Sequence, residues 1–547
     1  MKSDNRSKSS SNTAFSPLLT FGAILAAAVT FIVFFTALDN QFVALDDYEY
    51  IINNSHIEKL DWNTVWWAIT SFYQGNWHPL TMLSYALDRH LWGFDPAGYH
   101  LINILLHSFV VFVVCHLFSC ILRIAGNQNA DSARSQRNIV IGGIVGALFF
   151  GLHPLRVESV VWISERKDVL CLLFITSSVY FYLRYAQRRM AEPILSFRCY
   201  GYYMAALILA VLAMMSKPLA VSMPFILCII DWYPLRRWSG RDDFIHSNID
   251  KIPFLMFSVV LSVLTMFAQQ VAMKVFDELG LLSRVLVACK ALFFYLAKTL
   301  WPSDLAAFYV HPGDVASTAP VEYLVYAVLA AALLMVVIFA GRSSRMLPAL
   351  FCFYFVTLFP MLGLVQVGGQ WVADRYSYLP ALGLSLLWGG GIVWLLDRFD
   401  SKRNIGYSLP LAFVFCQLLI YGFLTIRQIP VWSNTETLAT RIIDLQPQRT
   451  GAVYYARAVY RNHGGQFQLA LEDIVEAMKI ALRQNRREYF SKIAFEQAQI
   501  LKNLGRLSEA LTMAEWGIQS SIDPPSADAM NLHEELKRLN TGAVRQN

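Results

Sequence analysis

Apolar blocks recur along most of this chain, each about 20 residues long, enough for a helix to cross a hydrocarbon core of roughly 30 Å. Of the 547 residues, 56% are hydrophobic and 15% are charged. Soluble domains carry about 25% charged residues. These features exclude a soluble enzyme, a fibrous protein and a disordered chain, and they predict a protein that lies mostly within a membrane.

The blocks predict an all-α polytopic membrane protein with about eleven spanning helices. They lie near residues 17–37, 101–122, 139–153, 169–185, 202–216, 219–232, 252–269, 322–340, 347–366, 377–396 and 407–426. The first block follows Lys2, Arg6 and Lys8, as a signal peptide would. It is longer than a usual signal-peptide core, and no A-x-A cleavage site follows it, so we interpret it as a retained anchor.

Basic residues between the blocks predict how the helices are oriented. If the N-terminus is cytoplasmic, every second loop is basic, as the positive-inside rule requires. These loops carry Arg134, Arg137, Arg188, Arg189, Arg236, Arg237, Arg241, Arg342, Arg345, Lys402 and Arg403. The stretch 284–302 contains Lys290, Lys298 and Pro302, and counting it as a span would place Arg342 outside. We therefore expect an amphipathic or re-entrant segment there, an odd number of spans, and an outward C-terminus.

The outer face then consists of loops 38–100 and 270–321, the turns near 154–168, 217 and 367–376, and the C-terminal tail. Any chemistry is expected on this face. The net charge of +6 comes from Lys and Arg scattered between apolar blocks, so it is a topology signal and predicts no nucleic-acid partner. Most of the eight cysteines lie in or beside apolar blocks, without CxxC spacing or a disulfide framework.

The tail is a different kind of sequence. From about residue 430 the apolar blocks stop and the chain becomes polar with helical periodicity, which predicts a membrane domain at 1–429 and a helical domain at 430–547. Two tail segments, one starting at Gly465 and one at Gly505, align with each other in the manner of tetratricopeptide repeats. Each has alanines at the expected offsets, namely Ala470 and Ala477, and Ala510 and Ala514, with Ala458 and Ala498 where two helices should cross. A generic pair of helical hairpins is the alternative.

An acidic pair, Asp46 and Asp47, follows the first span directly. Two adjacent carboxylates repel each other, so at least one should have a raised pKa or a cationic partner. That environment suits a general base, which must accept a proton near neutral pH. The alternative is a helix N-cap or a solvated start of the loop.

Several cations lie on the outer side, against the rule that orients the other loops. They are Arg156, Arg166, Lys167, Lys217 and Arg375, each beside the end of a span. An ionisable group at membrane depth indicates a functional site with a charged partner. That partner is either a lipid phosphate or a carboxylate of the chain itself, for which the candidates are Glu158, Glu165, Asp168 and Asp374.

Four histidines, His78, His100, His107 and His153, raise the question of a metal site. Two of them precede proline, which disfavours helix at the residue before it, so His78 and His153 are expected to end or turn helices. The sequence predicts no certain cofactor and leaves a divalent metal open.

The motifs together resemble the TMTC family. They are Asp46-Asp47-x-x-Tyr50-Ile51, His78-Pro79-Leu80-Thr81, Gly98-Tyr99-His100-Leu101-Ile102-Asn103, His153-Pro154-x-x-x-Glu158-Ser159-Val160-x-Trp162-x-Ser164-Glu165-Arg166-Lys167-Asp168, Lys217-Pro218, Asp231 and Asp374-Arg375-Tyr376-x-Tyr378. The resemblance covers essentially the whole chain, and the stretch from Glu158 to Asp168 is its most specific part. It implies a multispan membrane half with C-terminal tetratricopeptide repeats, although animal members have longer repeat arrays.

The resemblance also implies a GT-C glycosyltransferase, similar to protein O-mannosyltransferases, that takes a mannose-like hexose from a polyprenyl-phosphate donor. Members of the family place an acidic pair in the first outer loop, here Asp46 and Asp47. These residues would deprotonate the acceptor hydroxyl, and direct displacement would invert the anomeric carbon. The cations Arg156, Arg166, Lys167, Lys217 and Arg375 would meet the charge of the donor phosphate. His78, His153, Glu158, Glu165, Asp168 and Asp374 would support them.

Two alternatives remain at this stage. In one, the acceptor is a lipid or an envelope glycan instead of a protein. In the other, the chain is a non-catalytic membrane anchor that displays a repeat scaffold, although such an anchor gives no reason for the outer cations. The expected location is a bacterial inner membrane with periplasmic repeats, or a lumenal face in a eukaryote, and the repeats are expected to recruit the acceptor.

Overall fold

The computed structural model of the protein describes residues 17–126, 133–191, 196–268, 280–313, 315, 320–364, 369–399, 408–447, 450–522 and 524–544. Several residues that the topology prediction uses lie outside these ranges, namely Lys2, Arg6, Lys8, Lys402 and Arg403. Parts of the predicted outer segments 270–321 and 367–376 also lie outside them.

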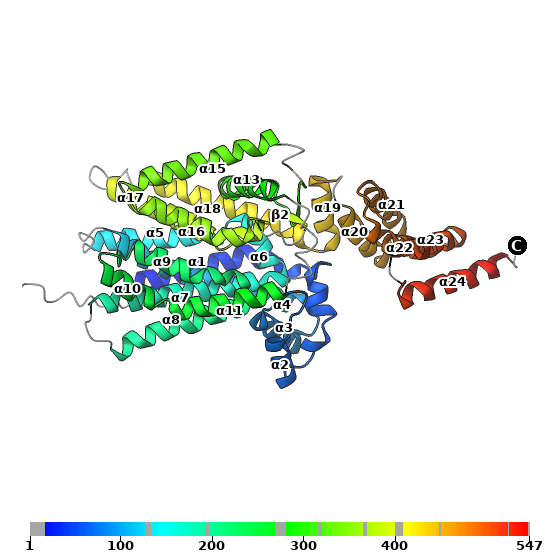
Figure 1. The fold of residues 1–547 in the computed structure, drawn as a ribbon, viewed down its shortest axis with the longest axis horizontal. Coiled ribbons are helices and arrows are strands. Elements are labelled where there is room, and N and C mark those ends of the chain that lie inside the picture. Colours follow the sequence, from blue (N-terminus) through cyan, green and yellow to red (C-terminus); the bar gives the residue numbers. More distant parts are fainter. Residues whose placement is uncertain are drawn as a thin grey trace, which may run out of the picture.

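A bundle of long helices forms one part of the molecule, and shorter paired helices extend from one end of it (Figure 1). The bundle contains α1 (Pro17–Phe34), α4 (Pro96–Ala125), α5 (Ala133–Gly151), α6 (Val157–Val161), α7 (Arg166–Ala191), α8 (Phe197–Ser216), α9 (Met223–Trp232), α10 (Arg241–Ile249), α11 (Ile252–Ala268), α13 (Leu281–Leu300), α15 (Pro320–Gly341), α16 (Met346–Leu358), α17 (Ala381–Phe399) and α18 (Ser408–Gln428). Two further helices, α2 (Trp62–Thr70) and α3 (Pro79–Trp92), lie at the end from which the tail emerges. The all-α polytopic fold predicted from the apolar blocks is confirmed.

Each of the eleven predicted apolar blocks contains a helix, but the helices differ in length. Among the described residues, six helices are long and apolar enough to cross a membrane, or up to eight if two bent pairs each count as one span. The six are Pro17–Asp39, Pro96–Ala125, Ile163–Ala191, Phe197–Ser216, Val321–Gly341 and Leu409–Trp432. The apolar segments 218–232 and 346–361 are shorter. The segment α13 is a helix but not one of these candidates, in keeping with the predicted amphipathic or re-entrant segment at 284–302.

Proline turns shape the end of the bundle that carries the outer loops. The α5–α6 pair bends by 58° at His153–Pro154, and His78 precedes α3, whose first residue is Pro79. Because proline lacks an N–H group and restricts the preceding residue, both turns follow from the sequence as predicted. The bend places α6 and the first turn of α7 at the end of the bundle.

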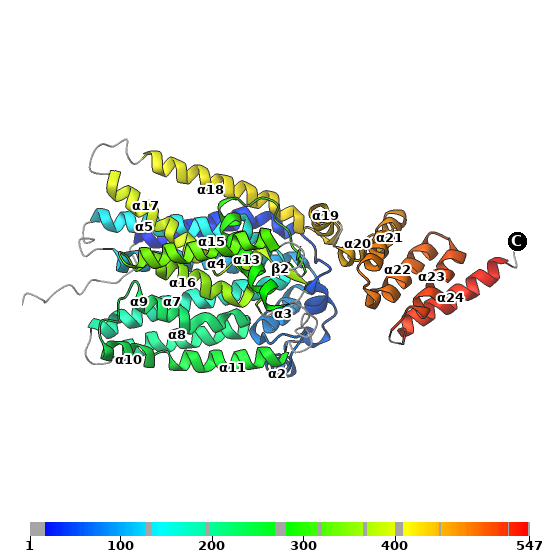
Figure 2. The same cartoon turned by 45° about the horizontal axis from the view of Figure 1, so that its top comes forward.

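The predicted outer segments gather at that same end (Figure 2). Strands β1 (Tyr309–Val310) and β2 (Gln370–Val372) pair antiparallel there, with Tyr309 opposite Val372. This pairing joins the second long loop to the turn before α17. The described ends of the basic loops lie at the opposite end of the bundle, as the positive-inside pattern predicts.

The tail consists of α19 (Thr435–Leu445), α20 (Gly451–His463), α21 (Phe467–Arg483), α22 (Phe490–Asn503), α23 (Leu507–Gln519) and α24 (Ala527–Val544). Helices α20 and α21 form one hairpin, and α22 and α23 form the next. The turns contain Gly465 and Gly505, both at φ 75°, which glycine adopts without strain. The alanines of the predicted repeat pattern, Ala458, Ala470, Ala477, Ala498, Ala510 and Ala514, are fully buried where helices cross.

Candidate active site

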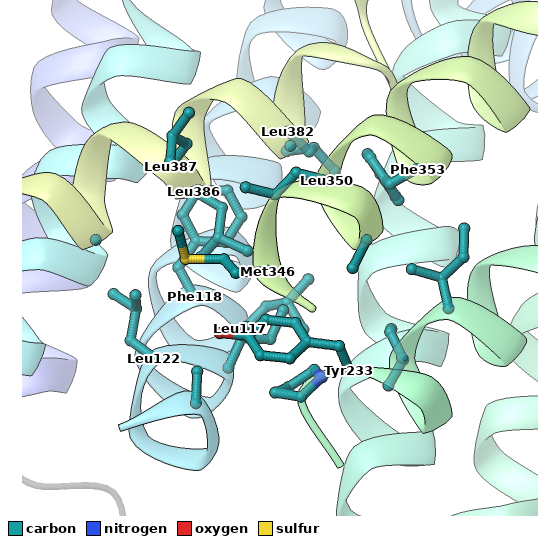
Figure 3. Close-up of a pocket in the computed structure, with 18 of the residues that line it drawn as sticks. Leu117, Phe118, Leu122, Tyr233, Met346, Leu350, Phe353, Leu382, Leu386 and Leu387 are labelled. Atoms are coloured by element: carbon teal, nitrogen blue, oxygen red, sulfur yellow. The ribbon is translucent and has the colours of Figure 1, made fainter. Parts of the chain in front are cut away.

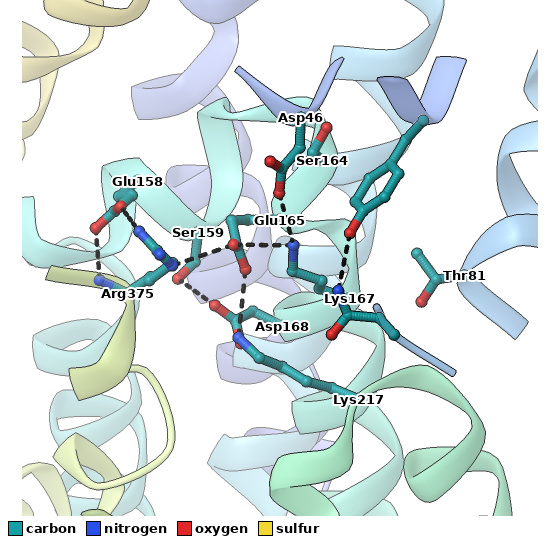
Figure 4. A network of polar contacts seen from close by, with 12 residues as sticks. Asp46, Thr81, Glu158, Ser159, Ser164, Glu165, Lys167, Asp168, Lys217 and Arg375 are labelled. Atoms are coloured by element: carbon teal, nitrogen blue, oxygen red, sulfur yellow. Dashed lines mark hydrogen bonds and ion pairs between the residues drawn. The ribbon is translucent and has the colours of Figure 1, made fainter. Parts of the chain in front are cut away.

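Four segments far apart in the sequence meet at the end of the bundle from which the tail emerges (Figure 4). They are the loop after α1, the α6–α7 junction, the turn between α8 and α9, and the short helical turn Asp374–Ser377 before α17. The long motif, residues 153–168, forms the centre of this site. It contains three short helical segments, Pro154–Arg156, α6 and Ile163–Glu165, and α7 begins directly after them at Arg166.

Glu165 contacts three cations of the site. Its carboxylate lies 3.1 Å from Lys167 Nζ, 3.3 Å from Lys217 Nζ and 3.1 Å from Arg375 Nε. Burying a carboxylate is costly unless cations or hydrogen-bond donors compensate its charge, and these three cations do so. Glu165 therefore fixes the positions of three of the five cations that the sequence singled out.

Each of the three cations also contacts a second carboxylate. Lys167 Nζ lies 3.5 Å from Asp46, and Lys217 Nζ lies 2.5 Å from Asp168. The Arg375 guanidinium pairs with Glu158, which also accepts a hydrogen bond of 2.7 Å from the Arg375 backbone N–H. We call these residues the charged cluster, comprising Asp46, Glu158, Glu165, Lys167, Asp168, Lys217 and Arg375. The sequence left a lipid phosphate or a carboxylate of the chain as the partner of each outer cation, and the structure places carboxylates beside these three.

The charged cluster is only partly open to its surroundings. The side chains of Lys167, Lys217 and Arg375 are 13%, 10% and 12% exposed, and that of Asp46 is 46% exposed. Glu158, Glu165 and Asp168 are buried. A ligand arriving at the cluster would therefore meet Asp46 first and the three cations behind it.

The two carboxylates of the acidic pair have different surroundings. Asp47 is buried and accepts hydrogen bonds from the backbone N–H groups of Val43 (3.0 Å) and Ser164 (2.9 Å), and from the Ser164 hydroxyl. Burial raises the pKa of Asp47 to about 6, against the lowering effect of these hydrogen bonds. Asp47 thus ties the first outer loop to the α6–α7 junction, whereas Asp46 faces Lys167.

Arg166 lies outside the charged cluster although its neighbours in the sequence belong to it. It is fully buried, pairs with Asp88 at 2.5 Å, and donates to the Asn103 side chain at 2.7 Å and the Tyr99 carbonyl at 3.0 Å. These contacts connect the start of α7 to α3 and α4.

Arg156 is also buried, and its hydrogen bonds go to Ser377 and not to a carboxylate of the cluster. It donates to the Ser377 carbonyl at 3.1 Å and to the Ser377 hydroxyl at 2.8 Å, and it packs beside the rings of Phe150 and Tyr378. It therefore connects the α5–α6 bend to the turn that carries Arg375. The sequence analysis expected Arg156 and Arg166 to bind the donor phosphate. In the structure both guanidinium groups contact groups of the protein instead.

Aromatic rings surround Lys167. Its Nζ lies 5.3 Å from the centroid of Tyr50 and 5.6 Å from that of Trp162, distances typical of cation–π contacts. His78 is buried with its ring 5.3 Å from that of Tyr50. Burial and the charge of Lys167 lower the pKa of His78 to about 3, so this imidazole is neutral at physiological pH.

Two other predicted supporting residues hold the loops in place. The His153 ring contacts the Thr299 carbonyl at 3.0 Å and accepts from the Leu155 N–H at 3.2 Å, which stabilises the α5–α6 bend. Asp374 accepts a hydrogen bond of 2.9 Å from Tyr309 of β1. Burial and the nearby Glu158 raise the pKa of Asp374 well above its usual value.

Some residues of the site were not among the predicted ones. Ser159 donates to Asp168 at 3.1 Å, and Ser164 donates to Asp47. Both lie between charged residues of the long motif, which was the available signal. Trp432 contacts Trp162 from the link to the tail, and nothing in its local sequence indicates that contact.

An apolar cavity of about 560 Å³ lies between helices of the bundle (Figure 3). Its lining includes Leu117, Phe118 and Leu122 of α4, Met346, Leu350 and Phe353 of α16, and Leu382, Leu386 and Leu387 of α17. Ile175 of α7 also lines it, seven residues after Asp168, or about 10 Å along a helix. Leu379, four residues after Arg375, lines it as well. Gly126, Tyr233 and Asp397 also line the cavity, and they lie towards the end of the bundle that carries the basic loops. The cavity therefore runs from the middle of the bundle, on the side of the charged cluster, towards the opposite end.

No group of three or more His, Cys, Asp or Glu side chains in the described part of the chain is arranged to hold a metal ion. The carboxylates of the charged cluster contact cations instead. We assign no cofactor to this site.

Comparisons with known proteins agree with the resemblance seen in the motifs. No family model matches the chain. The protein O-mannosyl-transferase TMTC4 of Homo sapiens is 29% identical over 160 residues, which are 28% of this chain and 21% of that protein. The protein O-mannosyl-transferase Tmtc2 of Drosophila melanogaster is 24% identical over 234 residues, which are 41% of this chain and 23% of that protein. The matched part thus spans about a fifth of these relatives.

Among solved structures, ArnT from Cupriavidus metallidurans bound to undecaprenyl phosphate aligns over 90% of this chain and 79% of its own. The identity is 16% and the TM-score is 0.36, which does not establish a common fold. In sequence, over the part that matches, the chain is similar to the TMTC protein O-mannosyl-transferases.

Proposed function

We propose that the chain is a GT-C-type membrane glycosyltransferase that transfers a mannose-like hexose from a polyprenyl-phosphate donor to an acceptor hydroxyl. Residues 1–429 form the transferase half, and residues 430–547 form a tetratricopeptide-repeat half on the same, extracytoplasmic side. The membrane is the inner membrane of a bacterium, so that this side is the periplasm. The observation that carries the proposal is Asp46, a half-exposed carboxylate 3.5 Å from Lys167 at the edge of the charged cluster.

Asp46 is the general base in this mechanism because it is the most exposed carboxylate of the cluster. The acceptor O–H gives its proton to Asp46 as the oxygen attacks the anomeric carbon. The bond from that carbon to the phosphate oxygen breaks, and its electron pair stays with the phosphate. A single displacement of this kind inverts the anomeric configuration. Asp47, which is buried against Ser164, positions the loop and does not touch the acceptor.

Lys167, Lys217 and Arg375 stabilise the leaving group. A polyprenyl-phosphate sugar carries one negative charge on its phosphate, and the released polyprenyl phosphate carries close to two. Fixed cations that meet this additional charge lower the barrier to transfer. All three already share Glu165, so they are held in place before the donor arrives. Arg156 and Arg166 brace the surrounding turns instead of contacting the phosphate.

The apolar cavity supports a lipid-linked donor over a nucleotide sugar. A prenyl chain is a hydrocarbon, and burying it in a cavity lined by leucine, isoleucine and phenylalanine is favourable. Ile175, at the near end of the cavity, lies about 10 Å from Asp168 along α7. A long prenyl chain whose phosphate lies at the cluster could therefore extend through the bundle into this cavity. The named activity of the relatives, protein O-mannosyl transfer, supports the choice of sugar and of a protein acceptor.

The proposal is tested with the purified full-length protein in lipid nanodiscs. It is offered radiolabelled mannose on a polyprenyl phosphate, and separately labelled GDP-mannose, each with an acceptor peptide rich in serine and threonine. We expect transfer, or hydrolysis of the donor, only with the lipid-linked sugar, together with release of polyprenyl phosphate. Transfer from the nucleotide sugar alone would contradict the proposed donor. No turnover of several lipid-linked hexoses would favour the non-catalytic scaffold.

A further inference from the structure

Trp432 lies at the end of the short helical turn Ile429–Trp432, between the last helix of the bundle and α19. Its side chain is fully buried, and its ring stacks on that of Trp162 with the centroids 5.6 Å apart and the planes at 24°. Trp162 belongs to the long motif, whereas Trp432 belongs to the link that connects the membrane half to the tail. The stack therefore joins two parts of the chain that the sequence keeps far apart.

Trp162 also contacts the cations of the charged cluster. Its ring centroid lies 5.3 Å from Arg375 Cζ and 5.6 Å from Lys167 Nζ. A cation near the face of an indole is attracted by the negative electrostatic potential of that face, more strongly where water is excluded. Trp162 is itself buried, so its ring has little freedom to move away from these cations. The orientation of Trp162 thus affects the positions of two cations at once.

The segment after Trp432 is fastened to both outer loops. The Thr435 hydroxyl accepts a hydrogen bond of 2.8 Å from the backbone N–H of Ala44, two residues before Asp46. The Gln446 side chain accepts from the Val310 N–H and donates to the Phe308 carbonyl, both at 3.0 Å. The start of the tail is therefore hydrogen-bonded to both long loops, and α19 lies beside the end of the bundle that carries β2 (Figure 1).

We propose that Trp432 is a positioning residue for the donor phosphate, which acts by holding Trp162 against Lys167 and Arg375. This inference rests on the proposed function, because it assigns the two cations to the phosphate of a polyprenyl donor. It adds that the link to the tail forms part of the site. A shift of this link would move Trp162, and with it the two cations, without any contact between the tail and the donor.

The test compares four proteins in nanodiscs: the wild-type chain, Trp432→Leu, Trp432→Phe and Trp516→Leu. Leucine keeps an apolar side chain at position 432 but removes the stacked ring, whereas phenylalanine keeps a ring. Trp516 is the matched control because it stacks on Phe490 within the tail, with centroids 5.9 Å apart and planes at 28°. The readouts are the Kd for undecaprenyl phosphate, the donor KM, kcat and the unfolding temperature.

We expect Trp432→Leu to raise the Kd and the donor KM by about tenfold, within the range for residues that modulate binding without touching the ligand. Trp432→Phe should recover most of this loss, and Trp516→Leu should match the wild type in both constants. A merely structural Trp432 predicts a lower unfolding temperature for both leucine variants with unchanged Kd and KM, and that result would overturn the inference. If the wild-type protein neither binds undecaprenyl phosphate nor uses a polyprenyl donor, the proposed function fails first and the inference falls with it.

Discussion

Lys167 and Asp46 form an ion pair at the exposed edge of the charged cluster, with 3.5 Å between Lys167 Nζ and the Asp46 carboxylate. The same ammonium lies 3.1 Å from Glu165. Lys167 therefore connects the exposed carboxylate of Asp46 to the buried carboxylate of Glu165. This arrangement separates two tasks that the sequence assigns to the acidic pair as a unit. Asp46 is 46% exposed, whereas Asp47 is buried and accepts hydrogen bonds from Val43 and Ser164.

Removing the charge of Arg375 should impair donor binding and chemistry together. Arg375→Gln leaves Glu158 buried without its cation, so we expect a lower unfolding temperature as well as a higher donor KM and a lower kcat. The double variant Arg375→Gln/Glu158→Gln removes both charges and should recover the unfolding temperature but not the kinetics. The control is Arg457→Gln/Asp473→Asn, a partly buried ion pair at 2.7 Å in the tail, which should leave the donor KM unchanged. Recovery of activity in the Arg375/Glu158 double variant would mean that Arg375 only neutralises Glu158.

Much of the fold follows from the sequence because it depends on local periodicity. Apolar blocks define helices wherever they occur, and proline fixes the turns at His78 and His153 regardless of distant contacts. The repeat glycines are equally local, since Gly465 and Gly505 occupy turns that require positive φ. The sequence also allowed the prediction that Lys167, Lys217 and Arg375 lie near one another, because the predicted topology places all three on one face of the membrane.

The direction of individual side chains could not be predicted. Arg166 and Lys167 are neighbours, yet one turns into a buried contact with Asp88 and the other joins the charged cluster. Which way each turns depends on how α7 packs against α3 and α4. The same holds for Asp46 and Asp47, and for the contact between Trp162 and Trp432, because these depend on segments that meet only in the folded protein.

Asp47 should make the stability of the protein depend on pH. Because burial raises its folded-state pKa from 3.8 to about 6, the stability it contributes is fully present below pH 3.8 and is lost as the pH rises through about 6. Relative to Asp47→Asn, the wild-type protein should lose on the order of 2 kcal/mol of stability between pH 4.5 and pH 7. Chemical or thermal unfolding of both proteins at the two pH values measures this difference. An identical pH dependence in the two proteins would exclude Asp47 as a group with a raised pKa.

The orientation in the membrane can be checked by cysteine labelling. Single cysteines are placed at five positions. Met190 lies at the end of α7, Gly240 directly before α10 and Ser344 between α15 and α16, whereas Ser55 lies in the first long loop and Met530 in α24 of the tail. All five positions are exposed. A membrane-impermeant maleimide should reach the first three only from the cytoplasm and the other two only from outside. Cytoplasmic labelling at position 530 would place the tail and the charged cluster on the wrong side for the proposed donor.

Deletion of residues 450–547 tests whether the tail recruits the acceptor without taking part in sugar transfer. The deletion keeps Trp432 and α19, and the main core of the membrane half lies outside it, so the truncated chain should insert and fold. A repeat surface beside Asp46 would raise the local concentration of a bound acceptor to about the mM range. We therefore expect unchanged turnover with water or a small acceptor but a higher KM for a macromolecular acceptor. An unchanged KM for the natural acceptor would show that the tail serves another partner.

The exposed carboxylate Asp46 gives the most direct test of the account. The measurement is kcat for sugar transfer from a polyprenyl-phosphate donor, with the donor Kd determined in parallel, for the wild type, Asp46→Asn and Glu58→Gln. Glu58 is an exposed carboxylate of the same loop and serves as the control. If Asp46 is the general base, Asp46→Asn should lower kcat by about 10² or more while the donor Kd and the unfolding temperature stay near wild type, and Glu58→Gln should be fully active. Near-normal kcat in Asp46→Asn would contradict the account.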